Sequence, residues 1–229
     1  DAVPDWGTSV LSFPDIFYFT LATKPNQTDL FCVYGGQINF ISTICTDCEP
    51  PSTPLLSFDH HILFTVKING SIHLSIANGL DAASQLGELD GTVSYMVVGK
   101  NNKAYIATGS SLYMLDDTEL NLKKINTSFL DFASHDDNKD DKIFVPYKNG
   151  IAFLTNKFGN ATLNYAEDTI ASLGSFDVGS SFTDLYGLCE VAGGLVFGVE
   201  NEGMYHYHES TGIKKTQLPE PLRLLEFNG

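Results

Sequence analysis

The chain has 229 residues, of which 43% are hydrophobic and 18% charged; this composition supplies a full apolar core and excludes a disordered protein. Its 13 basic and 28 acidic residues give a formal net charge of −15. Because such a field repels phosphate groups, the charge argues against nucleic acid and anionic membrane as partners. No apolar run reaches the ~20 residues of a membrane-spanning helix, so no membrane span is expected.

Similar pairs of apolar segments recur along the chain. Residues 11–19 (LSFPDIFYF) and 55–64 (LLSFDHHILF) match best, and looser copies follow at 95–108, 143–155 and 186–199. Each copy has two apolar strands around a tight polar or glycine-containing turn, which predicts a β-hairpin. The second strands are predicted to begin at Ile16, Ile62, Ala104, Ile151 and Leu195, with spacings of 46, 42, 47 and 44 residues.

A third and a fourth strand are predicted after each hairpin. The third strands are residues 30–34, 71–76, 112–115, 162–165 and 204–207, and the fourth are 38–44, 84–89, 120–125, 170–176 and 213–218. Four short strands every ~40–50 residues are typical of a β-propeller blade. We therefore predict an all-β chain forming a single domain over residues 1–229, a five-bladed β-propeller with four-stranded antiparallel blades. The approximate blades are 9–45, 54–89, 94–126, 142–177 and 185–227.

Two alternatives to this architecture stay open, a propeller with a different blade count and a β-sandwich. The repeats resemble β-propeller blades in general, but they lack the Gly-His and Trp-Asp dipeptides of WD40 repeats. The resemblance is therefore architectural and gives no residue a role. Residues 222–227 (LRLLEF) resemble a first strand again, and we expect them to return to the first blade and close the ring.

Sequence motifs point to the secretory pathway. The chain opens with DAVPDWG, which has neither a basic nor an apolar leader region, so any signal peptide is expected to be removed already. Four N-x-[ST] sequons are candidate N-glycosylation sites, at Asn26, Asn69, Asn126 and Asn160. We expect a secreted, extracellular glycoprotein whose sequons share one face, on the loops between second and third strands and between blades.

Four cysteines bear on the redox state of the chain. Cys45 and Cys48 have the C-x-x-C spacing, and no second pair of zinc ligands follows at a matching distance. A loop disulfide between Cys45 and Cys48 is therefore predicted. The pairing of Cys32 and Cys189 is left open.

Acidic and histidine side chains gather in the turns opposite the sequons, and these residues define a candidate binding face. Carboxylates there could hold calcium or meet a basic partner, whereas Asp in turns also bonds its own backbone. The alternating run Asp136, Asn138 and Asp140 is a weaker calcium candidate, because the glycine and distal glutamate of a calcium loop are missing. No other cofactor is expected. The candidate face comprises Asp59, His60, His61, Asp81, Asp116, Asp117, Glu119, Glu167, Asp168 and Glu209.

These patterns favour a non-catalytic recognition module that binds a glycan or an extracellular protein. The chain contains no G-x-S-x-G, H-E-x-x-H, Walker or G-x-G-x-x-G motif. A small secreted hydrolase acting on glycosides or phosphoesters with channel carboxylates is the first alternative, because such carboxylates need no linear motif. A structural or antigenic surface protein is the second. The oligomeric state is left open.

Overall fold

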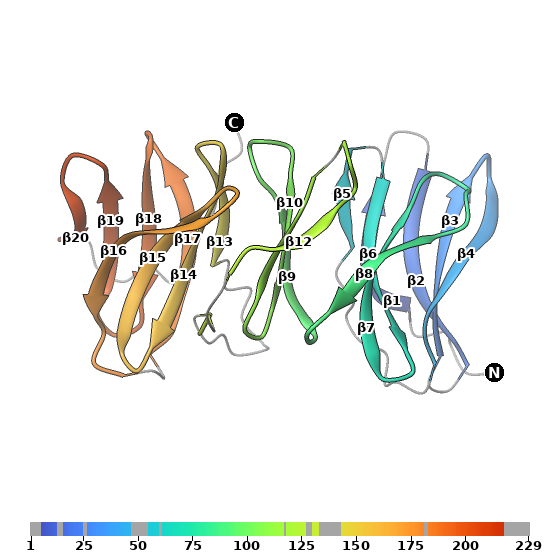
Figure 1. Cartoon of the computed structure of the whole chain (residues 1–229), viewed down its shortest axis with the longest axis horizontal. Helices are drawn as coiled ribbons and strands as arrows, with labels where there is room; N and C mark the ends of the chain where they lie inside the picture. Colours follow the sequence, from blue (N-terminus) through green and yellow to red (C-terminus); the bar gives the residue numbers. More distant parts are fainter. Residues whose placement is uncertain are drawn as a thin grey trace. The chain divides into compact units, whose positions relative to one another are not determined.

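The computed structural model describes residues 6–12, 16–24, 27–46, 55–59, 61–116, 118–126, 130–132, 143–180 and 183–217. Twenty β-strands lie in these ranges (Figure 1), which confirms the all-β prediction. Within the same ranges, no helix is long and apolar enough to cross a bilayer.

The strands form five consecutive groups of four, each made of antiparallel neighbours (Figure 1). The first blade contains β1 (Trp6–Ser12), β2 (Ile16–Lys24), β3 (Gln27–Tyr34) and β4 (Gln37–Thr46). The second contains β5 (Leu56–Phe58), β6 (His61–Ile68), β7 (Ser71–Ala77) and β8 (Ser84–Leu89). The third contains β9 (Val93–Val98), β10 (Ala104–Thr108), β11 (Leu112–Leu115) and β12 (Leu122–Lys124).

The last two blades repeat this order. The fourth blade contains β13 (Phe144–Tyr147), β14 (Gly150–Lys157), β15 (Asn160–Ala166) and β16 (Ile170–Asp177). The fifth contains β17 (Leu185–Val191), β18 (Gly194–Val199), β19 (Gly203–His208) and β20 (Gly212–Lys215). A single parallel pair, Cys45 with Lys67, also joins β4 of the first blade to β6 of the second. The five blades of the sequence prediction are thus confirmed.

The second strand of each blade begins within one residue of its predicted start, at Ile16, His61, Ala104, Gly150 and Gly194. Two of these starts are glycines for a steric reason. A Cβ on Gly150 would lie 2.0 Å from the Ala166 carbonyl oxygen, and one on Gly194 would lie 2.5 Å from that of Tyr207. Close approach of the third strand therefore requires glycine there. The predicted return of residues 222–227 lies outside the described part of the chain.

The chain divides into two compact units. The first comprises Asp1–Met96, Ile106–Thr108 and Tyr113–Lys123, and the second comprises the remainder, so the third sheet contributes to both. In the first unit, buried side chains from β2, β3, β4, β6 and β7 pack the first blade on the second. This core comprises Tyr18, Leu30, Cys32, Ile41, Ile44, Ile62, Phe64, Val66 and Ala77. In the second unit, stacked rings from β16, β18 and β19 pack the fourth blade on the fifth.

Candidate functional site

The acidic turns of the second unit are tied to lysines. Lys103, in the turn before β10, pairs with Asp168 in the β15–β16 turn, at 2.7 Å between Nζ and Oδ1. Lys148, between β13 and β14, pairs with Glu209 between β19 and β20, and this hydrogen bond lowers the pKa of the Glu209 carboxyl. In both pairs the lysine comes from one blade and the acid from the next, so two predicted face residues have their charge balanced locally.

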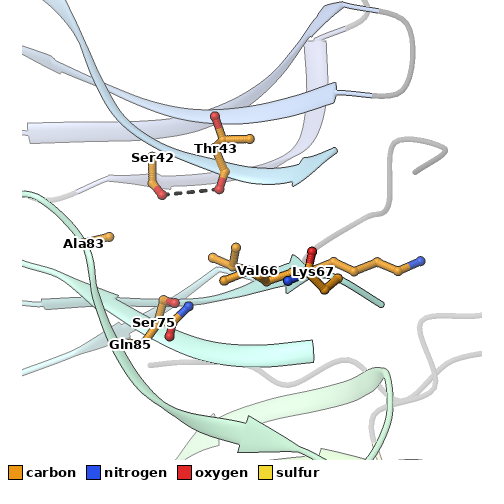
Figure 2. A pocket seen from close by; sticks show the side chains of 9 residues that line it. Ser42, Thr43, Val66, Lys67, Ser75, Ala83 and Gln85 are labelled. Atoms are coloured by element: carbon orange, nitrogen blue, oxygen red, sulfur yellow. Dashed lines mark hydrogen bonds between the residues drawn. The ribbon is translucent and has the colours of Figure 1, made fainter. Parts of the chain in front are cut away.

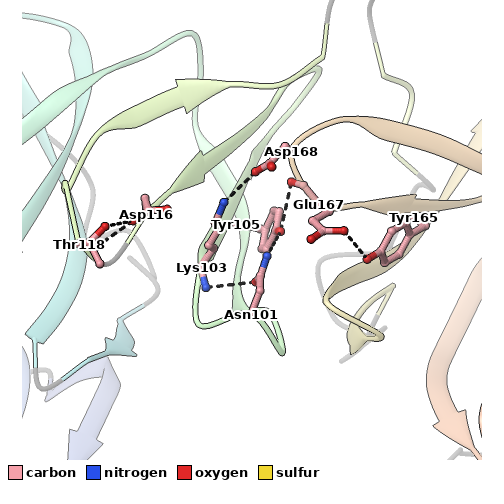
Figure 3. A network of polar contacts seen from close by, with 8 residues as sticks. All are labelled: Asn101, Lys103, Tyr105, Asp116, Thr118, Tyr165, Glu167 and Asp168. Carbon is pink, nitrogen blue, oxygen red and sulfur yellow. Dashed lines mark hydrogen bonds and ion pairs between the residues drawn. The ribbon is translucent and has the colours of Figure 1, made fainter.

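Glu167 belongs to a network that also joins neighbouring blades (Figure 3). The hydroxyl of Tyr105, on β10, donates to the Glu167 carbonyl oxygen at 3.2 Å and accepts from the Asn101 amide at 3.0 Å. The hydroxyl of Tyr165 donates to the Glu167 carboxylate at 3.1 Å. Burial raises the pKa of Tyr105, which keeps its hydroxyl in the neutral donor form. Glu167 is thus part of the contact between two blades.

The first unit has the same type of tyrosine contact, and its acids are turn residues. The Tyr18 hydroxyl on β2 donates to the Gly79 carbonyl oxygen of the next blade at 3.0 Å. The Asp116 carboxylate accepts from the Thr118 backbone N–H at 3.0 Å and from its hydroxyl at 2.6 Å (Figure 3). His61 donates from Nδ1 to the Asp59 carbonyl oxygen at 2.6 Å. Local backbone bonding of this kind is the usual role of Asp in turns.

The other predicted face residues are in turns or outside the described ranges. Asp81 and Glu119 are exposed, in the β7–β8 and β11–β12 connections. His60 and Asp117 lie outside the described residues, as do Asp136, Asn138 and Asp140. Among the side chains that are described, no group of three or more His, Cys, Asp or Glu is arranged to hold a metal ion.

A cavity of about 330 Å³ lies between the first and second blades, within the first unit (Figure 2). Its lining is mostly hydroxyl, amide and small aliphatic side chains, with Lys67 as its charged residue. The first blade contributes Ser42 and Thr43, both on β4. The second blade contributes Val66, Lys67 and Ile68 on β6, Asn69 in the β6–β7 turn, Ser75 on β7, Ala83 just before β8, and Gln85 on β8. Among the described lining residues there is no carboxylate and no aromatic ring.

Polar atoms in this cavity are available to a ligand. Ser75 is only 2% exposed, yet its side chain makes no hydrogen bond to another described residue. The Ser42 hydroxyl donates to the Thr43 carbonyl oxygen at 3.3 Å (Figure 2). Among the described residues, the fully buried side-chain oxygen without a partner is that of Thr28. The Ser75 hydroxyl instead opens on the cavity, where a bound polar group could take it as a partner.

Strand register explains why the cavity exists. Ser75 pairs with Phe64 of β6, and Tyr205 pairs with Phe197 of β18, so Ser75 and Tyr205 occupy equivalent positions in two blades. Tyr205 stacks on Phe176 of the preceding blade, with ring centroids 5.1 Å apart. The serine of the second blade leaves that space open.

The first blade also has an exposed apolar face on its side away from the core defined above. Register places Phe17 opposite Val33, Val33 opposite Ile38, and Phe31 opposite Phe40, so these side chains share a face. Phe17 is 39% exposed, Ile38 67% and Phe40 58%. Exposed apolar patches of this kind are typical of interaction surfaces.

The three described sequon asparagines differ in their surroundings. Asn69 is exposed in the β6–β7 turn, and Asn160 is exposed at the start of β15. Asn126 is half-buried: its side-chain oxygen accepts from the Leu112 N–H at 2.8 Å, and its amide donates to the Ser110 carbonyl oxygen at 3.2 Å. Asn26 lies outside the described residues, and glycosylation stays a prediction at all four.

The cysteines are placed only in part. Cys45 is on β4, and Cys48 lies outside the described residues, so the predicted disulfide stays a prediction. Cys32 is a buried thiol in the core of the first unit, and burial raises its pKa. Such a thiol is chemically inert at neutral pH. Cys189 is half-buried on β17.

Comparison with solved structures supports the fold alone. No family model and no curated protein matches the sequence. A catalytically inactive virginiamycin B lyase from Staphylococcus aureus, solved with quinupristin, is 13% identical with a TM-score of 0.56, over 95% of this chain and 72% of that one. A protein from Lactobacillus plantarum is 10% identical with a TM-score of 0.57, over 93% and 71%. Hsv2 from Kluyveromyces lactis is 11% identical with a TM-score of 0.50, over 96% and 74%.

The architecture is a β-propeller. The comparison to virginiamycin B lyase and the five antiparallel blades agree on this, whereas identities of 10–13% carry no residue roles to this chain.

Sequence reasoning missed both the cavity and the exposed apolar face. The cavity had no signal in the sequence, because the equivalence of Ser75 and Tyr205 appears only in the register of the strands. The apolar face carried no signal of its own, because its F-x-F pattern is the same as that of a buried strand.

Proposed function

We propose that the chain is a secreted, N-glycosylated recognition module that binds a glycan, without catalysis, in the cavity between β4 and β6–β8. The observation that carries this proposal is Ser75, whose buried side chain lines the cavity and makes no hydrogen bond to another described residue. A sugar hydroxyl is a suitable partner, because it can both donate to and accept from a serine.

The rest of the lining supports a polyhydroxylated ligand. Ser42 and Thr43 supply further hydroxyls from β4, and Gln85 supplies an amide from β8. Val66 and Ile68 offer apolar surface for the C–H groups of a sugar ring. The volume is at the lower end of the ~300–1,000 Å³ range of ligand pockets, so we expect the site to take a small saccharide or one terminal sugar of a glycan.

Hydrolysis has less support than binding. Glycoside hydrolysis ordinarily needs two carboxylates beside the scissile bond, and the part of the cavity lining that the structure describes contains none. Asp168 and Glu209 of the predicted face are paired with lysines, and Glu167 bonds Tyr165. The hydrolase and the structural surface protein therefore stay alternatives behind glycan recognition.

A glycan array tests the proposal. The probe is the full chain carrying Asn69→Gln, which keeps the cavity rim free of sugar, with and without calcium. We expect binding to survive chelation, because the lining residues within the described ranges include no carboxylate ligand. We expect Ser75→Tyr to abolish binding by filling the cavity. Absence of binding, or binding unchanged in a correctly folded Ser75→Tyr protein, would refute it.

Protein recognition is the second candidate, and the exposed Phe17, Ile38 and Phe40 side chains favour it. Its test is a binding screen against purified extracellular proteins, repeated with the Ile38→Ser, Phe40→Ser double variant. Loss of a partner in this variant, with the Ser75→Tyr protein still binding, would transfer the function to the apolar face.

A further inference from the structure

We infer that the exposed ring of Phe158 is the surface on which the first sugar of an N-glycan on Asn160 stacks, and that the β14–β15 turn is therefore a glycan-holding site. This inference rests on the N-glycosylation that the proposed function includes, and it does not depend on the cavity of the first unit. A stacked sugar would cover a large apolar side chain that otherwise stands in solvent.

Phe158 occupies a position where its ring gains little from the rest of the protein. It is the first residue of the two-residue turn between β14 and β15, with a φ of 53°, and it is 86% exposed. Bulky residues rarely adopt a positive φ, because the conformation costs free energy. The corresponding turn of the second blade has Asn69 there, a residue type that accepts this conformation more readily. The ring of Phe158 therefore calls for a partner outside the described protein core.

The turn that presents Phe158 is held in place from behind. The Val178 N–H donates to the Gly159 carbonyl oxygen at 2.8 Å, and the Gly159 N–H donates to Asn156 Oδ1 at 3.1 Å. The Asn156 amide donates in turn to the Ser180 carbonyl oxygen at 3.0 Å. A Cβ on Gly159 would lie 2.9 Å from the Ser180 nitrogen, so the turn packs directly on this segment. The ring is thus presented from a fixed backbone.

Asn160 lies within reach of this ring. Two residues span no more than about 7 Å even when extended, so the Cα atoms of Phe158 and Asn160 are no farther apart across the turn. Asn160 is exposed and pairs with Lys157 of β14. Thr162 shares its face of β15, and the Thr162 hydroxyl lies 3.0 Å from that of Ser175. A sugar on the Asn160 amide therefore begins beside the ring and over polar surface.

The chemistry of a sugar suits an aromatic ring. N-acetylglucosamine has faces lined by C–H groups, whose hydrogens carry partial positive charge, whereas the face of the Phe158 ring is negative. Contact between the two also removes apolar surface from water. A tethered sugar needs no affinity of its own to reach the ring, because the covalent link already holds it close.

The other sequons provide a contrast. Two positions before the asparagine, where Asn160 has Phe158, the other three sequons have a lysine; these residues are Lys24, Lys67 and Lys124. Asn126 also uses both ends of its side-chain amide to hold Leu112 and Ser110. Asn160 is therefore the sequon with a ring placed for its glycan.

The experiment uses the full chain secreted from eukaryotic cells, with mass spectrometry to establish which sequons are modified. An endoglycosidase trims each glycan to one N-acetylglucosamine. The unsubstituted chain, Phe158→Asn, Asn160→Gln and the double variant are compared by thermal melting, and sugars on the other sequons cancel in this comparison. Phe158→Asn gives the turn the residues of the second-blade turn and removes the ring without straining the backbone. Phe158→Tyr is the control that keeps a ring.

We expect Asn160→Gln to lower the melting temperature by about 2–4 °C when Phe158 is present and by less than about 1 °C in the Phe158→Asn background. Phe158→Tyr should preserve the larger loss. In NMR spectra, C–H protons of the sugar on Asn160 should lie upfield of their positions in Phe158→Asn, because they stand over the ring.

Equal melting losses in the two backgrounds, with sugar protons at the same positions, would overturn the inference and leave the proposed function standing. An unmodified Asn160 beside other modified sequons would do the same. Secreted protein without sugar on any sequon would overturn both this inference and the predicted glycosylation. Saccharide binding in the cavity is measured separately by the glycan array, so its failure leaves the Phe158 contact intact.

Discussion

The interface of the first and second blades and that of the fourth and fifth are built on the same strand register and filled differently. In the second unit, Tyr205 of β19 packs against Phe197 and Phe176, with ring centroids 5.8 and 5.1 Å away. In the first unit, the equivalent residue is Ser75, and a cavity of about 330 Å³ remains. One position of the third strand thus decides between core and cavity.

Equivalent positions in two blades with the same backbone can thus contribute differently to stability. The tyrosine buries a large ring and satisfies its hydroxyl, which donates to the Glu202 carboxylate at 2.5 Å. The serine has no ring to bury, and its hydroxyl lines the cavity without a hydrogen bond to another described residue. The second unit gains stability from the buried ring at this position, whereas the first forgoes that gain and retains a polar space, which is the pattern expected of a binding site.

The largest effect on stability is expected when the tyrosine of the fifth blade is replaced by the serine that the second blade has at the equivalent position. Tyr205→Ser removes a buried ring from a stack of three and leaves a cavity, so we expect unfolding in urea to become easier by about 3–5 kcal/mol. Far-ultraviolet circular dichroism should stay that of a β protein. A loss under 1 kcal/mol would mean that the ring stack contributes little.

Alkaline pH should separate the two interfaces next. Burial, followed by the hydrogen bond to Glu202, raises the pKa of Tyr205 to about 12. Since the unfolded chain releases this proton near pH 10, the stabilising contribution is complete below pH 10 and is lost as pH rises through 12. We expect a loss of about 2–3 kcal/mol over that window, which Tyr205→Phe should reduce. An unchanged alkaline transition in Tyr205→Phe would contradict this assignment.

Removing the serine hydroxyl should have a smaller effect on stability than on binding. Ser75→Ala removes a hydroxyl that lines the cavity without a described partner, so we expect a change within about 0.5 kcal/mol in urea unfolding together with weaker glycan binding. Thr43→Val, on β4 across the cavity from Ser75, is the control for a general effect of polarity. A destabilised Ser75→Ala protein would show that the hydroxyl is satisfied in solution.

The smallest effect is expected at the carboxylate that supports the ring stack. The hydrogen bond from Tyr205, and then that from Lys215, lower the pKa of Glu202. A carboxyl group with a lowered pKa contributes stability at pH values above its unfolded pKa. This contribution is lost as the pH falls through the lowered pKa of the folded state. Glu202→Gln should therefore cost less than about 1 kcal/mol at pH 7, and this cost should shrink as the pH falls below the usual carboxyl range, measured by thermal melting across that range.

Much of the fold could be predicted from the sequence because its repeat is local. Hairpin turns and alternating apolar residues are encoded within about fifteen positions, and the predicted second strands begin within one residue of Ile16, His61, Ala104, Gly150 and Gly194. The fourth strand of the second blade, Ser84–Leu89, was predicted to the residue. Steric needs at Gly150 and Gly194 reinforce the same repeat.

The site was harder to predict because it depends on contacts between blades. Asp168 and Glu209 looked like free rim carboxylates, but their lysine partners lie 65 and 61 positions away, at Lys103 and Lys148. Ser75 read as one more strand serine until its register with Phe64 was known. Sequence spacing within a blade predicts neither the lysine–carboxylate pairs nor the place of Ser75 in the cavity, since both depend on how two blades face each other.

The most direct test of glycan recognition is an NMR titration of the isotope-labelled Asn69→Gln protein with the saccharide that the array selects. The account predicts that shift changes concentrate at Ser42, Thr43, Ser75 and Gln85, and that they vanish in Ser75→Tyr. Changes centred on Phe17, Ile38 and Phe40, or on the turns of Asp59, Asp116 and Glu167, would contradict it and place recognition at the apolar face or the acidic turns instead.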